Sequence, residues 1–376
     1  MELKDLGSIK KPNLGKTVTQ VATLYNPRTW KEKGLWWTAG LFVVTYVLVV
    51  VVLGFIWSRS PGEFDVCEYA LALDQKSGKK FEVCGNNLPD DQKTKRKPVS
   101  GYVTTAAAIH IAETLLNKPG GYLSNDITPP GVYLDNIPNW EFGALTELRD
   151  LARSLRNDFS RSQTQSVEDK DLQTAEARFN YDTKSWILPS TESEYHSGTV
   201  ALYSYLYRLA DDRALDGQFF TRADNLNVYL AVVAQRLGSF AQRLASSVGV
   251  TRFDLNLAGD PNAHQSTPTP EQAHIKTDWF KIDDVFFEAR GYTWALLHTL
   301  KAIEIDFSDV LQNKNALVSL KQIIRELENT QAFIWSPMIL NGTGFGLMAN
   351  HSLIMASYIS RANAAIIDLR NLLLQG

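Results

Sequence analysis

The sequence predicts an all-α protein with one N-terminal transmembrane helix followed by an irregular multi-helix bundle. Three observations support this fold class. Residues 35–57 carry no charge, long segments beyond residue 100 repeat apolar residues every three or four positions, and no pair of segments alternates apolar and polar residues as paired strands do. With 44% hydrophobic and 21% charged residues, the 376-residue chain has the composition of a folded globular protein.

The apolar run from Leu35 to Trp57 reads LWWTAGLFVVTYVLVVVVLGFIW, 23 residues in all. As a helix it would be about 34 Å long, enough to cross a hydrocarbon core of about 30 Å. Trp36 and Trp37 at one end and Trp57 at the other stand where indole rings prefer the lipid headgroups. We therefore expect residues 35–57 to span a lipid bilayer, rather than to form a buried strand or helix of a soluble protein.

Charge predicts the orientation of this span. Of the 38 basic and 41 acidic residues, residues 1–34 hold seven and three, which leaves 31 and 38 for the rest of the chain. The positive-inside rule then predicts a cytoplasmic tail, residues 1–34, and export of everything after Trp57. A cleaved signal peptide is the alternative. The long tail, the length of the apolar run and the lack of a small-x-small site after Trp57 favour an uncleaved signal anchor. The acidic exported part does not favour nucleic acid as a partner.

Residues 58–99 are expected to form a linker and a cysteine-bearing loop. The chain has two cysteines, Cys67 and Cys84, with Ser77-Gly78 between them as a turn. In an oxidising compartment such a pair predicts one disulfide. Two unpaired thiols are the alternative, and a metal site is disfavoured because residues of ligand type are missing nearby.

Residues 100–376 are expected to fold into one exported helical domain of six to eight helices. Apolar spacing predicts helices near residues 104–117, 136–159, 195–211, 217–248, 278–305, 308–327 and 351–374, with Asn136 as a helix cap. Residues 160–194 are polar and weakly periodic, and prolines and glycines predict a long loop at 249–276.

The clearest amphipathic pattern lies in residues 217–248. A heptad seam continues through eight positions: Phe219, Ala223, Leu226, Leu230, Val233, Leu237, Phe240 and Leu244. The simpler interpretation is a core helix of an antiparallel bundle. An intermolecular coiled coil is the alternative.

The densest polar stretch, GGYLSNDITPPGVYLDNIPNWE, contains Asp126, Asp135 and Glu141 among aromatic residues. Carboxylates beside aromatics are what a glycan-cleaving cleft uses, with one acid protonated and the other charged. These three are therefore weak catalytic candidates. The structural alternative is a set of Asx turns and a helix cap in an ordered loop.

Other chemistry finds little support. The sequence has no Gly-x-Ser-x-Gly elbow, phosphate loop or dinucleotide fingerprint. His110 and Glu113 lie one helical turn apart, but the order is not the Glu-x-x-His of di-iron bundles and a second copy is missing. We therefore predict no cofactor and no metal.

The stretch TTAAAIHIAETLLNKPGGYLSNDITPPGVYLDNIPNWEFGALTELRDLARSLRNDFSRSQ, followed by STESEY, resembles an uncharacterised bacterial family of single-span inner-membrane proteins. The similarity extends from Tyr25-Asn26-Pro27-Arg28 to the C-terminal helix. It implies a Gram-negative inner membrane, with the C-terminal domain in the periplasm. It supplies no catalytic residue, and the segment from Cys67 to Cys84 is not a family feature.

These observations lead to two hypotheses. The first is a membrane-anchored periplasmic helical protein that acts by binding, as a scaffold or accessory subunit of a cell-envelope assembly with other envelope proteins as partners. The second is a membrane-tethered enzyme that acts on cell-wall glycan through Asp126, Asp135 and Glu141. An enzyme needs two of these carboxylates facing each other across a cleft, whereas a scaffold needs an exposed apolar patch or a groove without paired acids.

Overall fold

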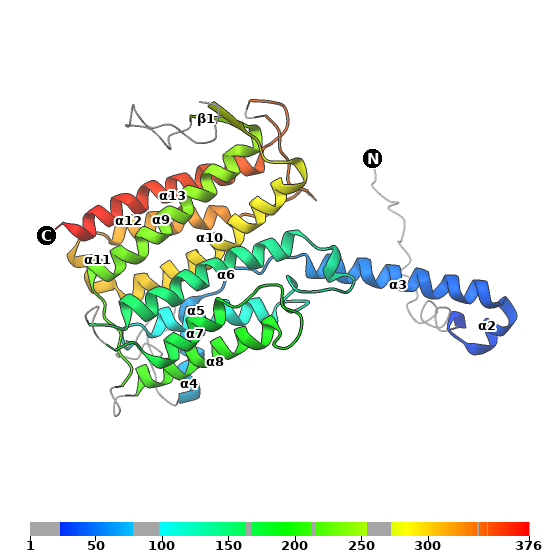
Figure 1. Cartoon of the computed structure of the whole chain (residues 1–376), viewed down its shortest axis with the longest axis horizontal. Coiled ribbons are helices and arrows are strands. Elements are labelled where there is room, and N and C mark those ends of the chain that lie inside the picture. Colours follow the sequence, from blue (N-terminus) through cyan, green and yellow to red (C-terminus); the bar gives the residue numbers. More distant parts are fainter. Residues whose placement is uncertain are drawn as a thin grey trace, which may run out of the picture. The chain divides into compact units, whose positions relative to one another are not determined.

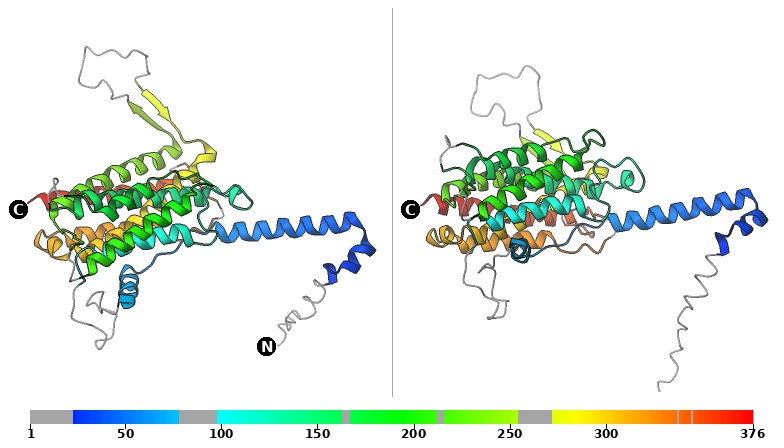
Figure 2. Two further views of the ribbon diagram at one scale, coloured as in Figure 1. Left: turned by 60° about the horizontal axis from the view of Figure 1, so that its bottom comes forward. Right: turned by 90° about the horizontal axis from the view of Figure 1, so that it is seen from below.

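The computed structural model describes residues 23–77, 98–162, 167–211, 216–253, 272–336, 338–343 and 345–375. The chain divides into two compact units, residues 1–56 and 57–376, and each is described by itself. The fold is all-α, as predicted, and Figures 1 and 2 show the helices.

The first unit holds α2 (Pro27–Lys33) and nearly all of α3 (Leu35–Trp57). Asn26 caps α2 by accepting a hydrogen bond from the backbone N–H of Arg28 at 3.0 Å. The ring of Trp30 lies 5.4 Å from that of Phe42, so α2 folds back beside the start of α3. No helix was predicted in this tail, so α2, whose following turn depends on Gly34 with φ 86°, was missed.

Helix α3 is 23 residues long with a mean hydropathy of 2.8 in its most apolar window. None of that window is buried against other parts of the chain. By length and composition, this helix is able to cross a membrane.

The second unit contains ten α-helices in its described residues. Nine of them lie within residues 100–376, one more than the upper limit that the sequence suggested for this range. The ten helices are α4 (Val66–Ser77), α5 (Tyr102–Asn117), α6 (Asn136–Ser154), α7 (Lys170–Phe179), α8 (Thr191–Ala210), α9 (Ala223–Ala245), α10 (Ile282–Asp306), α11 (Ser308–Asn313), α12 (Leu317–Thr330) and α13 (His351–Leu374). Single helical turns occur at Gly131–Tyr133, Leu155–Phe159, Ser246–Val248 and Trp279–Lys281. Strands β1 (Val250–Phe253) and β2 (Gln272–Ile275) form an antiparallel hairpin.

Helix α10 is the centre of the bundle and packs against α5, α6 and α12. Two glycines allow α6 and α10 to approach closely. A Cβ on Gly143 would lie 1.9 Å from the carbonyl oxygen of Glu288, and one on Gly291 would lie 1.9 Å from that of Trp140. Since only glycine fits at such distances, these two positions fix the contact between the helices.

Helix α9 carries the heptad seam and packs along α13. Its seam residues from Leu226 to Leu244 are buried inside this one chain. The interpretation as a core helix is therefore confirmed, and the seam is not free to form a coiled coil with another molecule.

The observed elements differ from the expected ones in five places. Helix α4 occupies part of the expected linker, and the short helix α7 lies in the weakly periodic segment, begun by a cap at Asp169. The single helix expected at 308–327 is two, separated by Asn315 in the left-handed region with φ 54°. The cap of α6 is Asp135 and not Asn136. The hairpin of β1 and β2 was predicted as part of a loop.

Candidate functional site

Glu141, one of the three predicted catalytic carboxylates, is fully buried near the start of α6. It forms an ion pair with Lys118 and accepts a hydrogen bond from the hydroxyl of Ser124. The backbone N–H groups of Leu123 and Ser124 each donate to one of its two oxygens at 2.9 Å. Burial raises the pKa of Glu141, while Lys118 and these donors oppose the shift. Both oxygens hold the loop that follows α5, so neither is free for a substrate.

Asp135 and Asp126 also support that loop. Asp135 accepts a hydrogen bond from the N–H of Asn136 at 2.9 Å and caps α6. Asp126 is half-buried against Gly131, where an added Cβ would lie 2.1 Å from its Oδ2 atom. Burial raises the pKa of Asp126, and the charge of Glu192 raises it further. In the structure, Glu141 binds backbone groups of the loop, Asp135 caps α6 and Asp126 lies against Gly131.

The His110 and Glu113 pair lies in a cluster of rings. Glu113 accepts hydrogen bonds from the hydroxyls of Tyr69 and Tyr203, at 2.8 and 2.7 Å. The ring of His110 lies 4.0 Å from that of Phe64 and 4.2 Å from that of Tyr69. Among the described residues no group of three or more His, Cys, Asp or Glu side chains is placed to hold a metal ion.

Cys67 is buried in the first turn of α4, where its N–H donates to the carboxylate of Asp65 at 2.8 Å. Its predicted partner Cys84 lies outside the described residues. The disulfide therefore stays a prediction.

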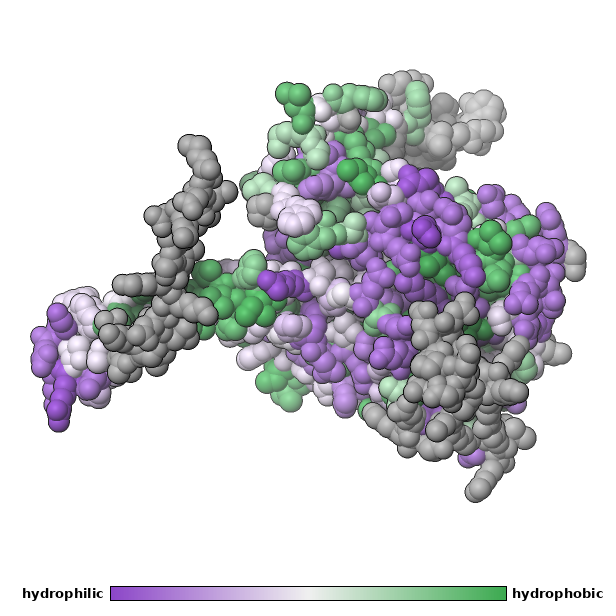
Figure 3. All heavy atoms as spheres, turned by 180° about the vertical axis from the view of Figure 1, so that it is seen from behind, coloured by the Kyte–Doolittle hydropathy of each residue, from purple (hydrophilic) through white to green (hydrophobic). Residues whose placement is uncertain are grey.

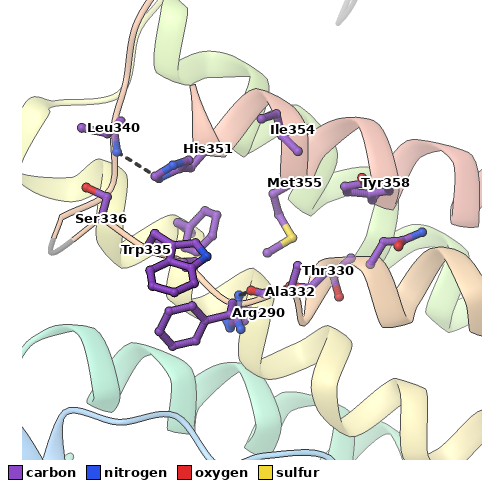
Figure 4. Close-up of a pocket in the computed structure, with 14 residues that line it drawn as sticks. Arg290, Thr330, Ala332, Trp335, Ser336, Leu340, His351, Ile354, Met355 and Tyr358 are labelled. Carbon is purple, nitrogen blue, oxygen red and sulfur yellow. Dashed lines mark hydrogen bonds between the residues drawn. The ribbon is translucent and has the colours of Figure 1, made fainter. Parts of the chain in front are cut away.

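A pocket of about 520 Å³ lies between α10, the end of α12, the segment after α12 and the start of α13 (Figure 4). Its walls are mostly apolar and aromatic, and no Asp or Glu is among them. The lining residues are Phe286, Arg290, Asn329, Thr330, Ala332, Phe333, Ile334, Trp335, Ser336, Leu340, His351, Ile354, Met355 and Tyr358.

Arg290 and His351 connect the elements that surround this pocket. Arg290 of α10 donates hydrogen bonds to the carbonyl oxygens of Gln331 and Ala332 at 2.8 and 3.0 Å, at the C-terminal end of α12. A cation is favourable there because the carbonyls at the end of a helix carry partial negative charge. Desolvation lowers the pKa of Arg290 to about 10, so the guanidinium stays charged at neutral pH.

His351 begins α13 and holds the other side of the pocket. The N–H of Leu340 donates to its Nδ1 atom at 3.1 Å (Figure 4). Nδ1 is therefore an acceptor and the neutral ring carries its proton on Nε2. Desolvation lowers the pKa of His351, which favours this neutral form. Arg290 and His351 thus bind the backbone of the segment between α12 and α13. No carboxylate takes part in these contacts or lines the cavity.

The segment between α12 and α13 presents aromatic side chains to solvent. Trp335 is 91% and Phe333 76% exposed, and their rings meet edge to face at 5.2 Å. In Figure 4, Trp335 and Met355 lie on facing sides of the pocket. This arrangement suits an apolar or aromatic group that inserts between Trp335 and Met355. The pocket wall has no pair of carboxylates for acid–base chemistry on a glycan.

The sequence profile of a bacterial family described as "uncharacterized protein conserved in bacteria" (DUF2333) matches residues 30–376. The chain belongs to this family. The match covers all of α3 and the whole helical domain, including the pocket. No curated protein and no solved structure matches the chain.

The pocket of this family member was not predicted from its sequence. The sequence assigned no role to the segment between the helices expected at 308–327 and 351–374, and the predicted candidates came from the acidic loop at 120–141 instead. One signal was present: apolar residues that follow no helical period, at Phe333, Ile334, Trp335 and Met338, stand between a helix and a glycine-rich stretch. Three of them, Phe333, Trp335 and Met338, are exposed, and neighbouring exposed apolar residues of this kind indicate a surface that binds.

Proposed function

We propose that this protein is a membrane-anchored binding protein of the bacterial envelope. Helix α3 holds it in the inner membrane with the N-terminal tail in the cytoplasm, and the helical domain acts in the periplasm as a scaffold or accessory subunit. The pocket between α10, α12 and α13 takes an apolar segment of a partner protein.

The observation that carries this proposal is the character of the pocket. Its walls combine the exposed rings of Phe333 and Trp335 with the buried side chains of Phe286 and Met355, and they contain no carboxylate. Apolar anchors in such concave sites supply most of the binding energy at protein interfaces, and aromatic residues are enriched there. A hydrolytic cleft would need paired acids, which this pocket does not offer.

Anchoring has separate support. Helix α3 is long and apolar enough to span, and it is not covered by the rest of the chain. The basic tail before it and the acidic domain after it fit the proposed orientation. A periplasmic reporter such as alkaline phosphatase, fused after the last residue, is expected to be active. Activity of a cytoplasm-only reporter at that position would show that the domain lies in the cytoplasm, opposite to the proposed orientation.

Two variants on α13 test the pocket as the binding surface. Ile354 lines the pocket and is 51% exposed, whereas Ile367 is 45% exposed and does not line it. After crosslinking in intact cells, pull-downs of wild type and of Ile367→Asp are expected to recover the same envelope protein, and Ile354→Asp is expected to lose it. Equal recovery with both variants would show that the pocket is not the binding surface.

The enzymatic alternative has its own test. Purified full-length protein is incubated with peptidoglycan, and soluble glycan fragments are measured. Release of fragments that stops with Asp126→Asn or Asp135→Asn would establish the glycan enzyme in place of the scaffold. We expect no release.

A further inference from the structure

Large apolar side chains are exposed at the loop tips at one end of the helical domain. Six of them come from four separate connections: Tyr133, Leu188, Phe280, Trp335, Phe345 and Leu347, each at least 73% exposed. We refer to these six residues as the apolar rim. Phe345 and Leu347 have essentially the exposure of free residues, so they add nothing to the core of the bundle.

Contacts between the loops place them at the same end. Asn125, in the loop before Tyr133, donates a hydrogen bond to the carbonyl oxygen of Ser185, in the loop before Leu188, at 2.9 Å. Asn139 at the start of α6 donates to Asp284 at the start of α10 at 2.7 Å.

The remaining loop is joined to α10 by Arg290, which donates to the carbonyl oxygens that follow α12. In Figure 3, hydrophobic residues gather at the top left of the bundle, in the region of the segment between α12 and α13. The six residues of the apolar rim therefore lie together at one end of the bundle.

Trp57, the last residue of α3, belongs to this same end. It is half-buried against the domain core, and a Cβ on Gly120 would lie 2.7 Å from its indole ring. Gly120 follows Lys118, which pairs with Glu141 at the start of α6. The residue that ends the apolar helix is therefore packed into the end of the bundle that carries the apolar rim.

We propose that the apolar rim rests in the surface of the same bilayer that α3 spans, on the periplasmic side. This inference depends on the proposed anchoring. Because Ile56 is covalently joined to Trp57, a membrane around α3 lies within reach of the rim wherever the span inserts. Tethering raises the effective concentration of the lipid surface, so weak apolar contacts suffice for docking. Trp, Tyr, Phe and Leu are the side chains that partition into the headgroup region.

The composition of the rim indicates which lipids it contacts. None of its six residues is charged, and both acidic and basic residues flank them, such as Asp278 and Lys281 beside Phe280. Insertion of apolar groups, rather than attraction to anionic headgroups, drives this contact. Docking is therefore expected on zwitterionic lipid and to be insensitive to salt.

Photocrosslinking to lipid tests the proposal with the full-length protein in nanodiscs of phosphatidylcholine. A benzophenone amino acid replaces Phe345 or Phe280 in the rim, Tyr46 in the middle of α3, or Val318 at the start of α12. Val318 is 78% exposed but lies at the end of α12 away from Arg290, so it is the matched control. Mass spectrometry then measures the fraction of protein that carries a lipid.

Lipid adducts are expected at Tyr46, Phe345 and Phe280, with yields at the two rim positions several-fold above that at Val318 in both low and high salt. Adducts at Tyr46 with none at the rim would overturn the docking while the anchor stands. No adduct at Tyr46 would overturn the anchor and the docking with it. Crosslinks from the rim to a second copy of the chain, instead of lipid, would reassign the rim to self-association.

Discussion

Lys118 and Glu141 form an ion pair that is closed to solvent, with side-chain exposures of 2% and 0%. The pair joins the end of α5 to the start of α6, and Lys118 also donates a hydrogen bond to the carbonyl oxygen of Gly121. Breaking a buried pair costs more than the pair contributes, because the remaining charge is left without compensation.

Replacing one partner of this pair is therefore expected to destabilise the protein strongly. Lys118→Met leaves the Glu141 carboxylate buried and unpaired, and the free energy of unfolding should fall by about 3–5 kcal/mol. Adding Glu141→Gln to this variant removes the stranded charge and should restore part of the loss. Urea unfolding of the detergent-solubilised full-length protein measures both. If Glu141→Gln alone leaves the urea midpoint unchanged, Glu141 does not stabilise the fold and is again a candidate catalytic residue.

Glu147 of α6 predicts a dependence of stability on pH. Its side chain is fully buried, and the hydroxyl of Tyr229 on α9 donates a hydrogen bond to it. Burial raises the pKa of Glu147 to about 8, from an ordinary value of 4.5. Between these two values the folded protein holds a proton that the unfolded chain has lost. Stability from this group is thus complete below about pH 4.5 and is lost as the pH rises to about 8.

The slope from this single group is at most about 1.4 kcal/mol per pH unit. Glu147→Gln keeps the shape but cannot ionise, so its advantage over wild type should grow from pH 6 to 8 and then level off. Comparing variant and wild type at each pH cancels the contribution of the histidines. Asp135→Asn, which changes an exposed carboxylate, is the control and should show no such trend. A constant difference between Glu147→Gln and wild type across this range would contradict the raised pKa.

The long helices were predictable because their burial repeats with the helical period. The bounds of α13 agree with the sequence prediction, and the seam of α9 named its core face correctly. What periodicity could not show was a break that depends on one residue. Asn315 adopts a positive φ and interrupts the helix between α11 and α12, although apolar spacing continues on both sides.

The candidate site was harder to predict for a different reason. The presence of an acidic residue in a sequence does not show whether its carboxylate faces a substrate or pairs with a lysine. Glu141 was chosen for its type, but its partner Lys118 lies 23 positions away in a turn that the sequence marked only as a helix stop. The pocket likewise depends on segments that meet only in three dimensions, where Arg290 of α10 holds the residues after α12 beside His351 of α13.

Leu230 and Val228 on α9 test the core assignment as a pair. Leu230 is fully buried and Val228 is 49% exposed. Leu230→Ala should leave a cavity and lower the free energy of unfolding by about 2–5 kcal/mol, while Val228→Ala should change it by less than about 0.5 kcal/mol. Because the seam is internal, the melting temperature of wild type should not depend on protein concentration. A melting temperature that rises with concentration would point to self-association through this helix.

Two glycine-to-alanine changes should have opposite signs. In a helix, alanine is favoured over glycine by about 1 kcal/mol. Gly238 of α9 has room for the methyl group, since the nearest atom to an added Cβ is the side-chain amide nitrogen of Asn363 at 3.6 Å. Gly238→Ala is therefore expected to raise the melting temperature.

Gly143 of α6 has no such room, because its Cβ would meet the backbone of α10 at 1.9 Å. A backbone atom cannot turn aside as a side chain does, so Gly143→Ala must push α6 away from α10 and reduce the packing of the ring of Trp140 on that of Trp294, now 5.0 Å apart. Overpacking of this kind costs about 1–3 kcal/mol, which exceeds the gain in helix propensity. Differential scanning fluorimetry should show a lower melting temperature for Gly143→Ala and a blue or red shift of the tryptophan emission that Gly238→Ala lacks. An increase in stability for both variants would mean that α6 and α10 do not touch at this glycine.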